Sequence, residues 1–145
     1  MWCPLPPAQI ILAETHPTFV GVVRLILKET MGTMLMVADE HSLIEAAVSP
    51  QLDLVIADLS FPISSGKNVA RLLQTLNPDL RAIILSVHDE QSVVDECLAA
   101  GTKGFVLKRS AATDLLAAVE AVLKGGIYIS PACCTQPEEV TPQRN

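Results

Sequence analysis

The chain has 145 residues, of which half are hydrophobic, 18% are charged and only 3% are aromatic, and its formal net charge is −6. This composition argues against intrinsic disorder and indicates one small domain, and the negative charge argues against direct nucleic-acid binding, which needs clustered lysine and arginine. No apolar run approaches the ~18 residues of a membrane span, and residues 1–7 lack the pattern of a secretory signal, so we expect a cytoplasmic protein that contacts no membrane.

Short apolar runs alternate along the chain with segments of helical pattern. Runs of this length that are rich in valine and isoleucine are typical of buried parallel strands. The expected strands are 10–13, 34–38, 54–57, 82–85 and 105–107. The expected helices are approximately 17–30, 40–48, 68–76, 90–100 and 111–124.

Polar residues and glycines bound several of these helices. Asp39, Asp89 and Ser110 stand at the positions where N-cap side chains accept hydrogen bonds from the first free N–H groups of a helix. Gly101 and Gly125 stand where a helix ends in the left-handed backbone region that favours glycine.

The strict alternation of strand and helix predicts an α/β fold. Right-handed crossovers then give a three-layer, doubly wound, five-stranded parallel sheet. We favour the flavodoxin-like strand order 2-1-3-4-5, whose switch point lies between the first and third strands. The order itself is not visible in the sequence, and the polar residues at the strand ends are the first reason to favour it.

Four of the apolar runs end on a polar or charged residue, namely Glu14, Asp58, Ser86 and Lys108. In an open α/β sheet the carboxyl ends of the strands lie along one edge, and ligands bind in the crevice outside that edge. We therefore expect two carboxylates, a hydroxyl and an ammonium group to converge there. Asp39 ends the edge strand away from the crevice, and we interpret it only as a helix cap.

The histidines and cysteines do not form a recognisable metal motif. His16, His41 and His88 lack metal-ligand spacing, and we expect them to be exposed or loop residues rather than ligands. Cys97 falls within a helical pattern and is expected in the core. The cysteine pair 133–134 has neither the second pair nor the histidines that a zinc site requires.

Four segments of the chain form a recognisable set, namely ILAETHP at 11–17, DLVIADLSFP at 53–62 with Gly66, LS at 85–86 and GFVLK at 104–108. On these segments, residues 9–131 resemble the receiver domain of two-component response regulators. The HP pair at 16–17 and the GIYISP segment at 126–131 further resemble the subfamily whose receivers precede a helix-turn-helix DNA-binding domain. The resemblance implies a flavodoxin-like signalling module rather than an enzyme.

The resemblance also implies the roles of individual residues. Asp58 would be the phosphoacceptor, taking a phosphoryl group from the phosphohistidine of a sensor histidine kinase. Lys108 and a magnesium ion would neutralise the oxygens of the transferred group. Ser86 would bind a phosphoryl oxygen, and Phe105 would be the switch aromatic that moves together with the Ser86 loop.

The implied magnesium site departs from the family pattern at one position. The ligands would be the carboxylates of Glu14 and Asp58 and the backbone carbonyl of Ser60. The family usually has a second acidic residue, a direct Mg²⁺ ligand, where this chain has Thr15. Threonine removes a full charge from the metal site, although a water molecule can take the vacant position. We therefore expect weak Mg²⁺ binding.

Each of these roles has a plainer alternative. Asp58 could cap a helix, and Lys108 could be a surface charge. Glu14 could be a solvated loop acid, Ser86 could satisfy a loop backbone group, and Phe105 could be ordinary core.

Two functions from different classes remain open. The first is a phosphorylatable receiver that controls dimerisation or an output domain. The second is a pseudo-receiver, a protein-interaction module that is independent of phosphate because Thr15 replaces the acidic ligand. A flavodoxin-like redox protein is disfavoured, because the loop after the first strand lacks a phosphate cradle and the chain has only one tryptophan and one tyrosine to stack on a flavin.

The expected domain organisation is a leader at 1–8, the receiver domain at 9–131 and a linker at 132–145 toward a missing output domain. The segment 138–143 resembles the start of that DNA-binding domain. We therefore expect these residues to be a fragment of a longer transcription regulator. The expected partners are a sensor histidine kinase, a second copy in a homodimer, and DNA only through the missing output domain.

Overall fold

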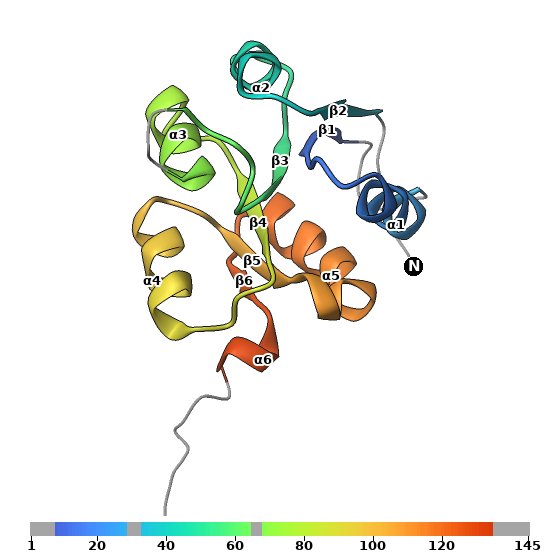
Figure 1. Cartoon of the computed structure of the whole chain (residues 1–145), viewed down its shortest axis with the longest axis vertical. Coiled ribbons are helices and arrows are strands. Elements are labelled where there is room, and N and C mark those ends of the chain that lie inside the picture. The colour runs from blue at the N-terminus through green and yellow to red at the C-terminus, as the bar shows by residue number, and fades with distance from the viewer. Residues whose placement is uncertain (1–7, 29–32, 65–67, 135–145) are drawn as a thin grey trace, which may run out of the picture.

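The computed structural model describes residues 8–28, 33–64 and 68–134. They form a six-stranded parallel sheet in the order β2-β1-β3-β4-β5-β6, with helices against both faces (Figure 1). The α/β class and the predicted order 2-1-3-4-5 are therefore confirmed.

The elements follow one another in strict βα alternation up to the fifth helix. The strands are β1 (Gln9–Ala13), β2 (Thr33–Val37), β3 (Leu54–Asp58), β4 (Ala82–Ser86), β5 (Gly104–Leu107) and β6 (Tyr128–Ile129). The helices are α1 (Pro17–Leu27), α2 (Glu40–Ala47), α3 (Val69–Leu76), α4 (Gln91–Ala99), the 3₁₀ turn η1 (Lys108–Ser110), α5 (Ala111–Leu123) and α6 (Pro131–Cys134).

Some parts of the predicted organisation fall outside the described residues. These are residues 1–7 of the leader, Gly66 of the second motif and residues 135–145 of the linker. In the part of the chain that the structure describes, no helix is both long and apolar enough to cross a bilayer.

The predicted count of five strands is wrong, because a sixth strand extends the sheet. Tyr128 pairs with Gly104 and Ile129 pairs with Phe105, parallel to β5. The strand has two residues, which is too short for a pattern of alternation to reveal it in the sequence. β6 therefore lies at the sheet edge opposite β2.

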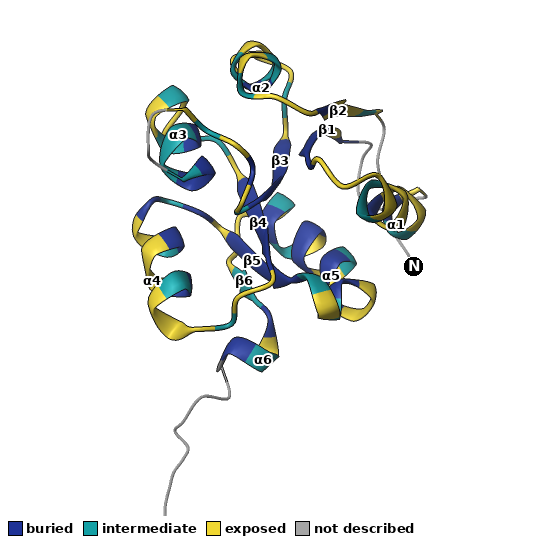
Figure 2. Cartoon of the chain, in the orientation of Figure 1, coloured by how far each residue is buried: buried dark blue, intermediate teal, exposed yellow. Residues whose placement is uncertain are grey.

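The central strands lie between two apolar cores, as parallel strands covered on both faces require. Along β1, Ile11 packs on the side of α2, α3 and α4, whereas Ile10 and Leu12 pack on the side of α1 and α5. Figure 2 shows β3, β4 and β5 buried throughout and the helices buried on their inner faces. Each fully buried leucine or isoleucine side chain stabilises the fold by about 1.5–3 kcal/mol. The sheet therefore holds the residues at its carboxyl edge in fixed positions.

The helix starts confirm one predicted cap and correct two others. Asp39 caps α2, and its Oδ1 accepts a 2.8 Å hydrogen bond from the Ser42 N–H. Asp89 does not cap α4, because that helix begins later with Glu90 at its N-cap. Ser110 stands at the N-cap of α5 without a side-chain capping bond, since a 3₁₀ turn leads directly into the helix.

α4 and α5 end beside the two glycines that were predicted to end them. Gly101 and Gly125, which follow α4 and α5, have φ values of 91° and 93°. This left-handed region favours glycine because it carries no Cβ.

Candidate functional site

The carboxyl edge of the sheet brings Glu14, Asp58 and Lys108 together. Glu14 directly follows β1, Asp58 is the last residue of β3, and Lys108 directly follows β5. The pairing of Ala13 with Ala57 sets the ends of β1 and β3 side by side. Parallel strands in this register therefore aim the three side chains into one crevice.

An ammonium group lies against both carboxylates. Lys108 Nζ is 2.9 Å from Glu14 Oε1 and 3.3 Å from Asp58 Oδ2. The side chains of Glu14 and Asp58 are 0% and 5% exposed, so their mutual repulsion is little screened by water. The lysine offsets that repulsion. Glu14, Asp58 and Lys108 thus converge in the structure as predicted.

An aromatic ring from α1 helps to hold Lys108. The ammonium lies 4.7 Å from the ring centroid of Phe19, within the range of a cation–π contact. Phe19 therefore borders the site, although its place in the sequence looks like that of an ordinary apolar helix residue.

Asp58 also accepts two hydrogen bonds from Ser60. The Ser60 backbone N–H donates to Oδ1 at 3.3 Å, and the hydroxyl donates to Oδ2 at 2.9 Å. Oδ2 is thus shared by a hydroxyl and the ammonium of Lys108. The predicted metal ligand in Ser60 is its backbone carbonyl, whose role stays a prediction.

Ser86 lies at the same edge and holds the loop that follows β4. Its hydroxyl accepts a 2.9 Å hydrogen bond from the His88 N–H and lies 3.3 Å from the His88 carbonyl oxygen. Ser86 pairs with Leu107, the residue before Lys108. In this arrangement it satisfies a loop backbone group, and its binding of a phosphoryl oxygen stays a prediction.

Phe105 is fully buried inside the sheet. It pairs with Ile84 on β4 and with Ile129 on β6, and it belongs to the core on the side of α2, α3 and α4. This position agrees with ordinary core packing, and a switching role for Phe105 stays a prediction.

His16 is a site residue that the sequence reasoning missed. Its Nδ1 lies 2.8 Å from Glu14 Oε2, and its backbone N–H donates to the same oxygen at 3.1 Å. Its side chain is exposed, as predicted, but it is not an isolated loop residue. The available signal was its spacing of two residues from Glu14 at the carboxyl edge.

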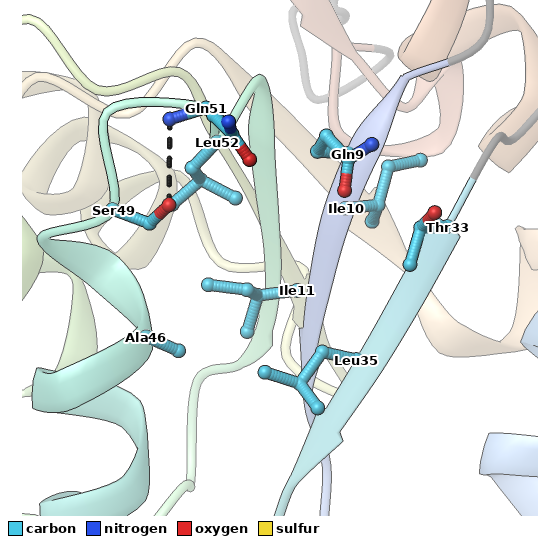
Figure 3. A pocket seen from close by; sticks show the side chains of 9 residues that line it. All are labelled: Gln9, Ile10, Ile11, Thr33, Leu35, Ala46, Ser49, Gln51 and Leu52. Atoms are coloured by element: carbon cyan, nitrogen blue, oxygen red, sulfur yellow. Dashed lines mark hydrogen bonds between the residues drawn. The ribbon is translucent and has the colours of Figure 1, made fainter.

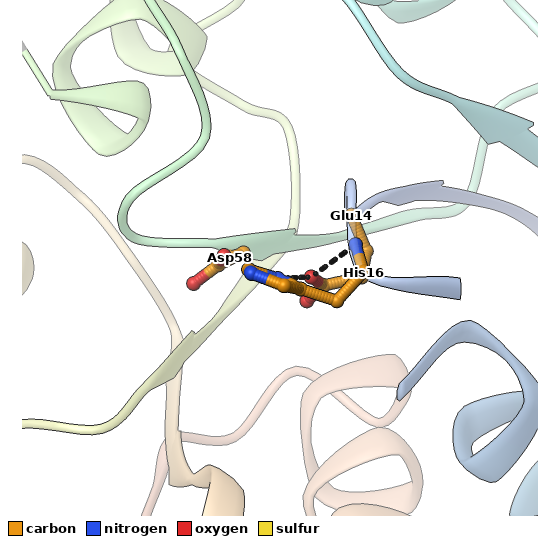
Figure 4. Close-up of side chains that lie close together, drawn as sticks. All are labelled: Glu14, His16 and Asp58. Carbon is orange, nitrogen blue, oxygen red and sulfur yellow. Dashed lines mark hydrogen bonds and ion pairs between the residues drawn. The ribbon is translucent and has the colours of Figure 1, made fainter. Parts of the chain in front are cut away.

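The same residues provide a donor set for a divalent cation. Glu14, His16 and Asp58 each offer one ligand atom, and the three atoms lie within 4.8 Å of one another (Figure 4). Two carboxylates fit a magnesium ion, which prefers oxygen ligands. Thr15 is exposed and adds no carboxylate to this set.

A separate pocket lies at the opposite end of the sheet and does not contribute to this site. Figure 3 shows it between the amino ends of β1 and β2 and the loop after α2. None of the described side chains that line it is charged. Glu14, Asp58 and Lys108 lie instead at the carboxyl edge.

Comparison with known proteins identifies the family. Residues 10–120 match the family model for the response regulator receiver domain. The transcriptional regulatory protein DegU of Brevibacillus brevis is 30% identical over 125 residues, covering 85% of this chain and 53% of that protein. The transcriptional regulatory protein UhpA of Salmonella typhimurium is 40% identical over 80 residues, covering 55% and 39%. The chain spans about half the length of the curated relatives it matches.

Solved structures show the same fold. The non-phosphorylated receiver domain of the stress response regulator RcsB from Escherichia coli superposes with a TM-score of 0.76 at 25% identity, covering 86% of this chain and 98% of that one. A LuxR-family two-component response regulator from Aurantimonas has a TM-score of 0.79 at 24% identity, covering 90% and 95%. The chain therefore belongs to the response regulator receiver domain family, a family of signalling modules rather than enzymes.

Proposed function

We propose that this chain is a phosphoacceptor receiver whose Asp58 takes a phosphoryl group from a sensor histidine kinase. The observation that carries the proposal is the ammonium of Lys108, 3.3 Å from Asp58 Oδ2 and 2.9 Å from the buried Glu14. The oxygens of a phosphoryl group gain negative charge during transfer, and a cation held beside the acceptor carboxylate stabilises that charge.

The chemistry requires positioning more than covalent work by the protein. A carboxylate oxygen of Asp58 attacks the phosphorus, the phosphorus–nitrogen bond of the phosphohistidine breaks, and the imidazole leaves. The Lys108 ammonium would then pair with a phosphoryl oxygen instead of with the Asp58 carboxylate. A bound Mg²⁺ supplies further positive charge, and its proposed ligands are Glu14, Asp58 and the backbone carbonyl of Ser60.

The proposed output is a change of the surface formed by α4, β5 and α5. Ser86 would exchange its hydrogen bond with the His88 backbone for a phosphoryl oxygen, which would draw the loop before α4 inward. Phe105 is adjacent to that rearrangement in the core. The altered surface would control dimerisation or an output domain.

The wider organisation is also a proposal. We assign residues 9–131 to the receiver and 132–145 to a linker toward a DNA-binding output domain, through which alone DNA would be bound. The relatives DegU and UhpA are named as transcriptional regulators, and the chain spans about half of DegU and 39% of UhpA, which supports this division.

A pseudo-receiver is the second candidate, and two observations favour it. Thr15 offers no carboxylate to a metal ion, and Asp58 Oδ2 is already shared by the Ser60 hydroxyl and Lys108. A chain that cannot clear this oxygen would keep the fold as an interaction module without phosphorylation.

Incubation with acetyl phosphate and Mg²⁺, followed by intact-mass measurement, tests both candidates. The native chain and the control Asp79→Asn, an exposed acid before β4, are expected to gain a phosphate adduct, and Asp58→Asn is expected to gain none. An equally strong adduct on Asp58→Asn would contradict the proposed acceptor. An adduct on Thr15→Asp but not on the native chain would support the pseudo-receiver.

A further inference from the structure

The ammonium of Lys108 lies against two carboxylates and over one aromatic ring. Its Nζ is 2.9 Å from Glu14 Oε1 and 3.3 Å from Asp58 Oδ2. It also lies over the ring of Phe19, 4.7 Å from the ring centroid. Because the lysine side chain is only 14% exposed, these contacts, rather than bulk water, determine where its charge is held.

The fold fixes the place of this aromatic ring. Phe19 lies in the first turn of α1, which begins at Pro17, shortly after the end of β1. That turn is therefore at the carboxyl edge of the sheet. The side chain of Phe19 is partly buried against the core that α1 and α5 share on one face of the sheet (Figure 1). Packing thus holds the ring in position, and the ring can support the more flexible lysine side chain.

An aromatic face holds an ammonium group differently from a carboxylate. The ring attracts the cation through its quadrupole but carries no net charge, so the ammonium keeps its attraction for a further anion. The contact with Asp58 has to be exchanged for a phosphoryl oxygen, whereas the contact with the ring can persist throughout. The ring also excludes water from one side of the ammonium, which strengthens the attraction between that charge and an anion.

We propose that Phe19 is a positioning residue, which holds the Lys108 ammonium beside Asp58 to meet the incoming phosphoryl group. Without the ring, the long lysine side chain gains rotamers that turn its ammonium toward solvent. A displacement of about 1 Å from the reacting group is enough to slow a reaction strongly. The inference rests on the proposed function, because it concerns the acceptance of phosphate by the same Asp58.

Phosphorylation kinetics of ring variants test this inference in the whole chain. Intact mass follows the rate of adduct formation with acetyl phosphate and Mg²⁺. Phe19→Leu keeps an apolar side chain but removes the ring, and we expect its rate to fall about fivefold or more. Phe19→Tyr restores an aromatic face, and its rate should stay within about twofold of that of the native chain.

Two further changes separate the electrostatic attraction of the ring from its packing. Trifluorophenylalanine at position 19 keeps the shape of the ring but weakens its negative face, so its rate should lie between those of the native chain and Phe19→Leu. The matched control is Ile26→Ala, which removes apolar volume from the same core about two turns further along α1. This control should accept phosphate as fast as the native chain, and circular dichroism shows that each variant is folded.

The proton resonances of the Lys108 ε-methylene group give a readout that needs no phosphate. Protons over the face of an aromatic ring are shifted upfield by its ring current, and the absence of these resonances from Lys108→Arg assigns them. We expect the upfield shift in the native chain and in Phe19→Tyr, and its loss in Phe19→Leu. A merely structural role of Phe19 would not produce this pattern.

Three results would overturn the inference. They are equal rates in the native chain and Phe19→Leu, a rate in Phe19→Tyr as low as that in Phe19→Leu, and an equally large fall of the rate in Ile26→Ala.

The two readouts separate this inference from the proposed function. An adduct on Asp58 that forms equally fast with and without the ring would keep the proposed function and refute the role of Phe19. If the native chain gains no adduct, the proposed function fails, and the Lys108 resonances decide the inference. An upfield shift that is lost in Phe19→Leu would then support the positioning of the ammonium by Phe19, and the absence of such a shift would refute it.

Discussion

The hydroxyl of Ser130 donates a 2.8 Å hydrogen bond to Oδ2 of Asp114, and both side chains are buried. The same hydroxyl accepts a 3.0 Å bond from the N–H of Leu107. The segment after β6 is thereby fastened to α5 and to the end of β5, one residue before Lys108. The carboxyl edge of the sheet and the segment after β6 therefore share one buried polar connection.

Removing this hydroxyl is expected to destabilise the domain. In Ser130→Ala the buried Asp114 carboxylate and the Leu107 N–H lose a partner, so the free energy of unfolding should fall by about 1–3 kcal/mol. Urea denaturation followed by circular dichroism measures the change. The control Ser92→Ala, at an exposed position of α4, should stay within about 0.5 kcal/mol of the native value, and equal losses in the two variants would contradict the prediction.

Tyr128 should make stability depend on pH in the alkaline range. Burial, followed by the charge and hydrogen bonding of Asp114, raises the pKa of Tyr128 above its usual 10.0. The folded state therefore holds this proton to higher pH than the unfolded state does. The free energy of unfolding is unaffected well below pH 10 and falls as the pH rises through that value.

Urea denaturation between about pH 8 and pH 11 measures this dependence. The fall should be smaller in Tyr128→Phe, which lacks the titrating hydroxyl. The same slope in both proteins would refute the contribution of Tyr128.

Two helix starts are expected to respond differently to alanine. Asn68 Oδ1 accepts a 3.0 Å hydrogen bond from the Arg71 N–H at the start of α3, so Asn68→Ala should cost about 0.5–2 kcal/mol. Asp89 instead pairs with Arg109 at 2.9 Å between partly exposed side chains, and Asp89→Ala should cost at most about 1 kcal/mol. Thermal unfolding compares the stability of the two variants. A larger loss of stability in Asp89→Ala than in Asn68→Ala would indicate that Asp89 does cap α4.

A double-mutant cycle should reveal strong coupling between Lys108 and Glu14. Lys108→Ala leaves two buried carboxylates without their cation, and we expect a loss of about 3 kcal/mol. Adding Glu14→Gln removes one uncompensated charge and should recover part of that loss. Chemical denaturation of the four proteins measures the coupling, and strictly additive effects would show that the ion pair does not stabilise the fold.

Much of the fold could be predicted because burial on both faces imposes continuous apolar strands. The carboxyl ends of such strands meet at one edge, which is why Glu14, Asp58 and Lys108 could be grouped from the sequence. The strand order needed the resemblance to a family as well. Which atoms touch depends on side-chain rotamers and loop backbone, which no periodicity encodes.

Three features could not be predicted, each for its own physical reason. β6 has two residues, a single period of alternation, which is too short to show a repeating pattern. Asp89 faces Arg109, a residue 20 positions away that only the folded chain brings near. The direction of His16 depends on its extended backbone before α1, with φ −91° and ψ 109°.

The strand β6 also determines how far this domain can be shortened at its carboxyl-terminal side. An unpaired strand edge is a template for pairing with other molecules, and β6 covers Gly104 and Phe105 on the outer edge of β5. A protein shortened to end at Leu123 would keep every residue of the proposed phosphoacceptor site but would leave the outer edge of β5 unpaired. Such a fragment should self-associate through that edge. A recombinant domain that stays monomeric therefore needs to extend beyond Ser130.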